Sequence, residues 1–242
     1  TEQIQNCMLI HQQPEDLLAR KGRLDGTRVW RTPVLQDGRV FLRKDEESRA
    51  GFTVDLMLDA SASRLRCQES IAIEGYILAK SLAACGIPVR VTSFCSLRGY
   101  TVLHILKDFG DKNGERRVFA AGWNRDGLAL RGMGELIKSA PEEKHLLLLL
   151  TDASPNDSHK ILPSGKVPLS REYDGQSGID DTAAEVRSLR AKGVAALFMG
   201  ENSSVPAANA IYGRDLVRIR RIDQLASAAG RLIQDEIREL SL

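Results

Sequence analysis

The chain has 242 residues, of which 43% are hydrophobic and 27% are charged, and its formal net charge is +2. A chain of this size and composition can bury a core of its own and is typical of a soluble globular protein rather than a disordered one. The nearly balanced charge, without basic blocks that interleave with aromatics, disfavours a nucleic-acid partner. The longest apolar run, Leu146 to Leu150, is far below the roughly 20 residues that span a bilayer.

Residues 1–50 are predicted to form an N-terminal extension with a helix and a β-hairpin. A short helix is expected after Pro14, through Leu17 to Ala19, with Gly22 closing it. Asp37-Gly38 is typical of a two-residue turn, so the segments 33–36 and 39–42 are expected to pair as a hairpin. The chain begins with Thr rather than Met, and we expect it to be part of a longer protein.

Residues 51–242 alternate apolar strands with amphipathic helices. This alternation predicts an α/β, Rossmann-like, doubly wound domain, in which a mostly parallel central sheet carries helices on both faces. Strands are expected at 52–58, 89–94, 101–106, 144–150, 194–199 and 216–219, and helices at 66–84, 126–139, 180–192, 205–212 and 222–240. The strand at 101–106 is expected to run antiparallel, because the connection before it is too short for a crossover helix. The continuous apolarity of 144–150 indicates the middle of the sheet, and residues 153–178 are expected to form a long loop.

Acids follow two of the predicted strands, at the sheet edge where open α/β folds bind their ligands. Asp59 ends the first strand and is followed by Ser61 and Ser63, while Asp152 follows the central strand. These oxygen-only side chains could converge on one point, and they suit Mg²⁺, with Mn²⁺ or Ca²⁺ as alternatives. The ion would keep a free position, which a carboxylate from a partner protein could fill.

Other interpretations of an acid after a strand fit the sequence less well. A D-x-D phosphoryl-transfer site would need a carboxylate where the chain has Ser61, and neither a P-loop nor a G-x-G-x-x-G turn is present. A serine nucleophile would need a histidine base, yet His11, His104, His145 and His159 fit no triad pattern. A purely structural alternative stays open, in which Asp59 and the serines cap the following helix.

At these residues the chain resembles the von Willebrand factor A (VWA) family, whose metal-ion-dependent adhesion site (MIDAS) is D-x-S-x-S, then a Thr, then an Asp after the fourth strand. Residues 58–63 and 150–155 match the first and last parts of that pattern, and the resemblance spans roughly residues 50 to 240. It implies a metal-dependent protein-binding module, not an enzyme.

Within that family the chain is most similar to the bacterial NorD and CobT branch, the nitric oxide reductase activation proteins and cobaltochelatase subunits. The similar segments are 22–25, 124–130, 151–157 and 178–182. Proteins of this branch work with a MoxR-type AAA+ ATPase to mature a client enzyme or insert its metal cofactor. The resemblance implies a cytoplasmic adaptor with such an ATPase and a client enzyme as partners.

The chain departs from the family pattern at the Thr. Asn124 takes that place if the segment is aligned on Gly127, and its amide oxygen could bind the ion directly or through water. Asp126 is a competing candidate for the same place, and Asp126 and Asp157 are possible second-sphere residues. Asp157 and Asp180 could instead be a loop turn and a helix N-terminus.

The expected metal ligands are therefore Asp59, Ser61, Ser63, Asn124 and Asp152. Two alternatives to a metal-dependent binding module remain open. One is a hydrolase in which the same ion activates water, although no general base is placed for it. The other is a passive VWA scaffold without bound metal.

Overall fold

The computed structural model describes residues 16–44, 52–111, 118–191, 195–200 and 205–218, together with 224, 228, 230 and 231. Short gaps lie inside these ranges at 20, 22, 28, 36–37, 119, 142–143, 164–167 and 214–215. Most of the predicted helix at 222–240 lies outside the described residues. The boundary predicted at residues 50 and 51 lies in another undescribed segment, 45–51.

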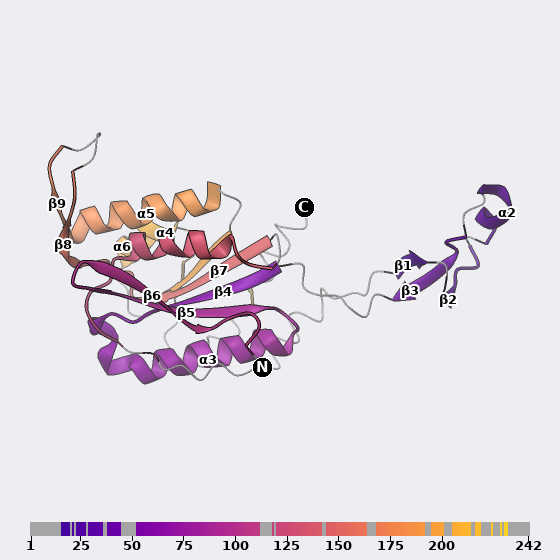
Figure 1. The fold of residues 1–242 in the computed structure, drawn as a ribbon, viewed down its shortest axis with the longest axis horizontal. Coiled ribbons are helices and arrows are strands. Elements are labelled where there is room, and N and C mark those ends of the chain that lie inside the picture. Colours follow the sequence, from indigo (N-terminus) through magenta and orange to yellow (C-terminus); the bar gives the residue numbers. More distant parts are fainter. Residues whose placement is uncertain are drawn as a thin grey trace.

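A six-stranded sheet forms the centre of the molecule, in the order β11-β10-β7-β4-β5-β6 (Figure 1). Its strands are β4 (Phe52–Asp59), β5 (Val89–Leu97), β6 (Tyr100–Lys107), β7 (Lys144–Thr151), β10 (Ala195–Gly200) and β11 (Leu216–Arg218). Every neighbouring pair is parallel except β5 and β6, which are antiparallel. The predicted α/β class, the antiparallel strand and the central position of β7 are thus confirmed.

Helices cover both faces of this sheet. The 3₁₀ helix η1 (Ala62–Cys67) and helix α3 (Gln68–Ala84) lie on one side, while α4 (Asp126–Ile137), α5 (Gly175–Ala191) and α6 (Val205–Tyr212) lie on the other (Figure 1). Helix α3 ends at Ala84, as predicted, and Gly86 follows it with a φ of 75°, in the left-handed region that glycine tolerates best.

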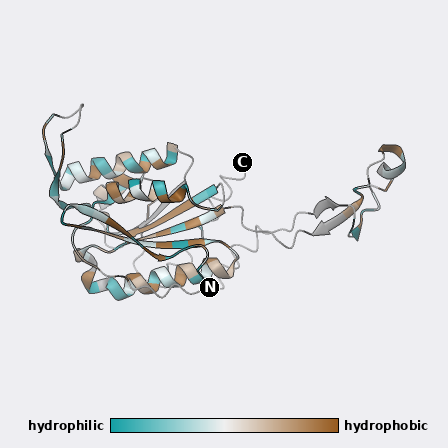
Figure 2. Cartoon of the chain, viewed as in Figure 1, coloured by the Kyte–Doolittle hydropathy of each residue, from teal (hydrophilic) through white to brown (hydrophobic). Residues whose placement is uncertain are grey.

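The buried core is divided by the sheet into two clusters. In β7, Leu146, Leu148 and Leu150 pack with α3, whereas Leu147 and Leu149 pack with α4, α5 and α6. Successive side chains of a strand point to opposite faces, so a strand covered on both sides must be apolar at every position. Figure 2 shows this concentration of hydrophobic residues in the strands between the helix layers.

The N-terminal residues form a small three-stranded antiparallel sheet in the order β1-β3-β2, which Figure 1 draws apart from the large one. Its elements are β1 (Asp16–Ala19), β2 (Arg23–Leu24), α2 (Arg31–Leu35) and β3 (Phe41–Lys44). Two local predictions are wrong here: 17–19 is a strand rather than a helix, and 33–35 is helical rather than the first arm of a hairpin. β3 pairs with β1 and β2 instead, and Pro33 is accommodated in the first turn of α2, where no backbone donor is needed.

The segment predicted as a long loop, 153–178, contains regular structure. An antiparallel hairpin joins β8 (Asp157–Ile161) and β9 (Arg171–Tyr173), and α5 begins at Gly175, five residues before the predicted start. The segment is rich in polar and turn-forming residues, which are typical of loops, so the sequence did not predict this hairpin. As a result Asp180 lies in the second turn of α5 rather than at its N-terminus.

Candidate metal centre

The centre begins where the parallel strands β4 and β7 end side by side. Leu58 is in register with Leu150, so Asp59 and Thr151 follow at neighbouring positions. Asp59 is completely buried, and its Oδ2 accepts a hydrogen bond from Thr151 Oγ1 at 3.3 Å. The topology of the sheet therefore brings the two halves of the sequence motif to one point.

A chain of hydrogen bonds joins the predicted ligands. The backbone N–H of Ser61 donates to Asp59 Oδ1 at 2.9 Å, and the Oγ atoms of Ser61 and Ser63 lie 2.9 Å apart. Ser63 Oγ then donates to Asp152 Oδ2 at 3.1 Å. Ser61 is the N-cap residue of η1 but makes no side-chain capping bond, which argues against capping as the role of its hydroxyl. Because Ser63 is exposed and Asp152 is half-buried, the centre is open to solvent on that side.

The loop at 120–124 packs against this chain of oxygens. Ala62 N–H donates to Gly122 carbonyl at 3.0 Å, and Ala121 N–H donates to Ala60 carbonyl at 2.8 Å. Gly122 has a φ of 68°, and a Cβ there would lie 2.1 Å from the carbonyl oxygen of Ser96. Only glycine allows so close an approach, which positions the following Asn124.

Asn124 is buried and faces Asp59, but with its amide nitrogen. Nδ2 lies 3.4 Å from Asp59 Oδ2, while Oδ1 accepts the backbone N–H of Asn156 at 3.1 Å. The backbones of Asn124 and Asn156 also exchange two hydrogen bonds. The amide oxygen, predicted to be available to an ion, thus accepts a backbone donor with one of its two lone pairs. In this arrangement Asn124 orients the carboxylate of Asp59.

Asp126 is the first residue of α4 and is completely buried. Neither of its carboxyl oxygens has a hydrogen-bond partner among the described residues. Burial, followed by the nearby charges of Asp59 and Asp152, raises the pKa of Asp126 well above its ordinary range. A buried acid with no donor and two acidic neighbours is energetically unfavourable unless a proton or a cation compensates it.

The other predicted acids have partners of their own. Asp157 is buried; its Oδ2 lies 3.7 Å from Arg125 Nη1, and its Oδ1 accepts the backbone N–H of His159. Asp180 is exposed on α5 and accepts a hydrogen bond from Gln176. These contacts give both residues a structural explanation.

The sequence reasoning missed Tyr173, a fully buried residue of β9. Its hydroxyl accepts the backbone N–H of Gly127 at 3.2 Å, and the guanidinium of Arg125 lies 4.7 Å from its ring centroid. Burial and the charge of Asp126 raise the pKa of Tyr173, so its hydroxyl keeps its proton. Tyr173 thus supports the first turn of α4 behind Asp126. The only signal for it in the sequence was an aromatic residue in a polar segment.

The donor set can be compared with what a cation requires. Among the described residues no three Cys, His, Asp or Glu side chains gather as a metal-binding group. The oxygens that do meet belong to Asp59, Ser61, Ser63 and Asp152. The carboxyl group of Asp126 is close enough for the charges of Asp59 and Asp152 to raise its pKa. Mixed carboxylate and hydroxyl oxygens of this kind fit a hard divalent cation such as Mg²⁺.

Known proteins resemble the chain in sequence over about half of its length. It is 32% identical to NorD of Brucella abortus over 125 residues, 49% of this chain, and 31% identical to NorD of Stutzerimonas stutzeri over 132 residues, 51% of this chain. An uncharacterized protein of Pseudomonas aeruginosa is 32% identical over 136 residues, 53% of this chain. The matches span only 18% to 20% of these relatives' own lengths. No protein-family model matches the chain.

Solved structures resemble the chain in fold. The von Willebrand factor domain of the pilus tip protein Mfa5 from Porphyromonas gingivalis superposes with a TM-score of 0.53 and 11% identity, covering 77% of this chain and 95% of that domain. The pilus adhesin SpaC from Lactobacillus rhamnosus GG gives a TM-score of 0.53 with 15% identity, over 76% of this chain and 30% of SpaC. Within the described residues, no helix has both the length and the apolar character to cross a membrane.

Proposed function

We propose that this chain, which has a von Willebrand factor-type fold and NorD-like sequence over half its length, is a metal-dependent protein-binding module. The observation that carries the proposal is Asp126, whose two buried oxygens accept no hydrogen bond from the described residues and lie near the acids Asp59 and Asp152. A divalent cation among these carboxyl groups would offset their mutual repulsion. The protein would then gain stability, and the cation would offer an electrophilic position at the protein surface.

Asp59, Ser61, Ser63 and Asp152 would hold the cation, with Asp126 behind them. Asn124 would act on Asp59 by orienting its carboxylate. The bound cation supplies a Lewis-acidic position for one further oxygen. Since Ser63 is exposed and Asp152 half-buried, that position would face solvent, where a carboxylate of a partner protein could reach it.

The finer part of the proposal concerns partners. Similarity to NorD supports an adaptor that works in the cytoplasm with a MoxR-type AAA+ ATPase in maturation or metal-cofactor insertion of a client enzyme. The similarity covers half of this chain and about a fifth of each relative. The partnership with an ATPase, the client enzyme and the cytoplasmic location are therefore proposed for the whole protein, in which this chain would be the binding module.

Isothermal titration of Mg²⁺ into the wild type and Ser63→Ala tests the metal part, with Ser154→Ala as a matched control. Both serines are exposed, but only Ser63 hydrogen-bonds through its hydroxyl to Asp152, whereas Ser154 uses its backbone N–H. Loss of a metal-site contact should weaken affinity by about tenfold or more, and the control should match the wild type. Equal heats from all three proteins would refute the proposed site.

Two further measurements separate the proposal from its alternatives. Binding of a MoxR-type ATPase should be lost in EDTA, while a passive scaffold would bind equally with and without it. A hydrolase would turn over model phosphoesters in a manner that needs both Mg²⁺ and Asp152. Two of the described histidines, His145 and His159, hydrogen-bond Thr53 and Ser158 rather than the site serines, so neither of these two supports the hydrolase as a base for those serines.

A further inference from the structure

Four large apolar side chains are exposed next to the candidate metal centre. Their exposed fractions are 61% for Leu65, 42% for Leu97, 76% for Tyr100 and 45% for Trp123. We call these four residues the rim. Scattered exposed apolar residues need no explanation, but a group of them beside a functional centre marks an interaction surface.

Sequence position and backbone contacts place the rim residues beside the loops of the centre. Leu65 lies in η1, two residues after Ser63, and Trp123 directly precedes Asn124. Trp123 exchanges two backbone hydrogen bonds with Ser96, of 2.7 and 2.9 Å. Leu97 follows Ser96, and its Cδ2 would lie 2.7 Å from a Cβ at Gly122. It pairs with Tyr100 at the end of the β5–β6 ladder.

These contacts hold the rim in place before any partner binds. Gly122 packs so closely against Ser96 of β5 that a Cβ would not fit. Ala120 N–H donates to Oε1 of Gln68, the first residue of α3, at 3.1 Å. The loop at 120–123 is therefore held against both β5 and α3. A preorganised surface loses little conformational entropy on binding. Trp and Tyr are, moreover, side chains that contribute most at the centres of protein interfaces.

Exposed basic residues accompany the rim. Arg66 follows Leu65, and Arg98 occupies the tight turn between Leu97 and Tyr100. Arg98 has a φ of 51° and Gly99 one of 84°, as in the two-residue turns that join antiparallel strands. Two arginines beside the rim favour an acidic ligand over a basic one.

We propose that the rim, with Arg66 and Arg98, binds an acidic segment of a partner protein in which apolar side chains flank the carboxylate that reaches the metal centre. This inference rests on the proposed function, because the carboxylate is placed by the bound cation. It adds the chemistry of the residues around that carboxylate. A carboxylate without apolar neighbours would contact only the metal centre. A segment with apolar side chains beside the carboxylate would also contact the rim and bind more tightly.

The test compares two capped peptides, acetyl-Asp-amide and acetyl-Phe-Asp-Leu-amide, titrated calorimetrically into the whole chain with saturating Mg²⁺. Burial of one apolar side chain corresponds to about a tenfold gain in affinity, so the apolar peptide should bind at least about tenfold more tightly. Tyr100→Ser and Leu65→Ser should each remove most of that preference. Thermal unfolding of each variant checks that it folds.

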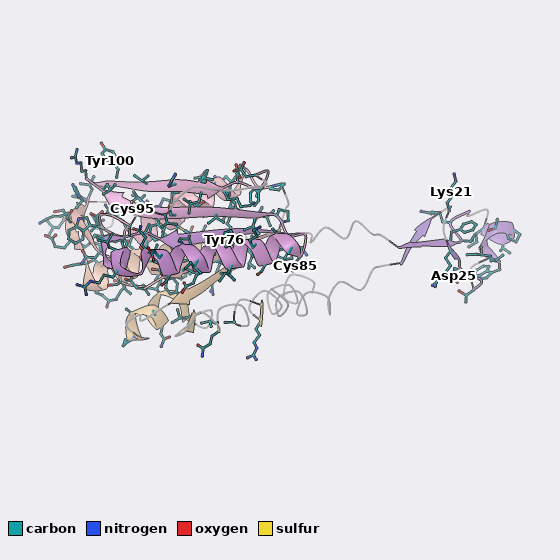
Figure 3. The ribbon with its side chains drawn as sticks, turned by 90° about the horizontal axis from the view of Figure 1, so that it is seen from below. Lys21, Asp25, Tyr76, Cys85, Cys95 and Tyr100 are labelled. Atoms are coloured by element: carbon teal, nitrogen blue, oxygen red, sulfur yellow. The ribbon has the colours of Figure 1, made fainter. Side chains whose placement is uncertain are left out.

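Tyr76→Ser is the matched control. Tyr76 is 61% exposed on α3, and Figure 3 shows it midway along that helix, whereas Tyr100 lies at the end of the sheet opposite Cys85. The control should keep the full preference. Loss of preference in Tyr76→Ser, or its retention in both rim variants, would place the apolar contact elsewhere and overturn the inference.

The remaining outcomes separate the rim from the metal centre. If Mg²⁺ binds and both peptides bind equally, the rim inference is wrong and the proposed function stands. If Mg²⁺ fails to bind, both fall. If the chain dimerises in sedimentation and rim substitutions abolish the dimer, the rim serves a second copy of the chain and the acidic partner segment is overturned.

Discussion

Replacing Asp126 with Asn should stabilise the metal-free protein and weaken its response to Mg²⁺. The substitution keeps the size of the side chain but removes a buried carboxyl group that must carry either a charge or a proton, that accepts no hydrogen bond from the described part of the chain and that stands near Asp59 and Asp152. An unsatisfied buried polar group costs about 1 to 3 kcal/mol, and a charged one costs more. The amide that replaces the carboxyl group would itself be unsatisfied, so the expected gain is about 1 to 3 kcal/mol rather than the full cost of a buried charge.

Thermal unfolding in EDTA and in Mg²⁺ measures both effects. For a chain of this length 1 kcal/mol corresponds to a Tm shift of about 2 to 4 °C, so Asp126→Asn should melt at least about 2 °C above the wild type in EDTA. A cation at about 100 times its Kd stabilises the wild type by about 2.7 kcal/mol. Mg²⁺ should stabilise the variant clearly less, because the variant lacks one of the carboxyl groups whose repulsion the cation would offset.

The exposed Asp180 provides the control, since Asp180→Asn removes an acid that is exposed and hydrogen-bonds Gln176. It should change neither the Tm in EDTA nor the gain from Mg²⁺. A variant at Asp126 that melts below the wild type in EDTA, or that gains as much from Mg²⁺, would refute the reasoning about this residue.

Three further substitutions test the structure around the centre. Gly122→Ala should lower the urea midpoint far more than Gly86→Ala. Both glycines have positive φ, where an alanine costs about 1 to 2 kcal/mol. Only at Gly122 would the added Cβ also clash with the Ser96 carbonyl. Burial, despite an ion pair, raises the pKa of Asp55 above 3.8, so its favourable contribution is complete below that pH and is lost as the pH rises. The free energy of unfolding of the wild type, taken relative to that of Asp55→Asn, should therefore be lower at about pH 7 than at about pH 3.5. Tyr173→Phe leaves a first-turn N–H of α4 without its acceptor and should cost about 1 to 3 kcal/mol in chemical unfolding.

Local patterns predicted the large domain well and the N-terminal part poorly. The apolar runs at 52–58 and 144–150 became the adjacent strands β4 and β7, because a strand buried on both faces has few alternatives. In the N-terminal part, by contrast, the run at 17–19 became a strand only by pairing with β3, at residues 41–43. Such pairing is non-local, so Pro14 and Asp37-Gly38 were insufficient guides to it.

By itself, the sequence determined which side chains meet at the centre. Asp59, Ser61 and Ser63 follow one strand and Asp152 follows another, and parallel neighbours end at the same edge of a sheet. Only the tertiary structure decided how the remaining polar groups are used. The backbone N–H of Asn156 donates to the amide oxygen of Asn124. The packing of α4 leaves Asp126 buried without a donor from the described residues. Those outcomes depend on contacts between segments far apart in the chain, which neither periodicity nor motif spacing encodes.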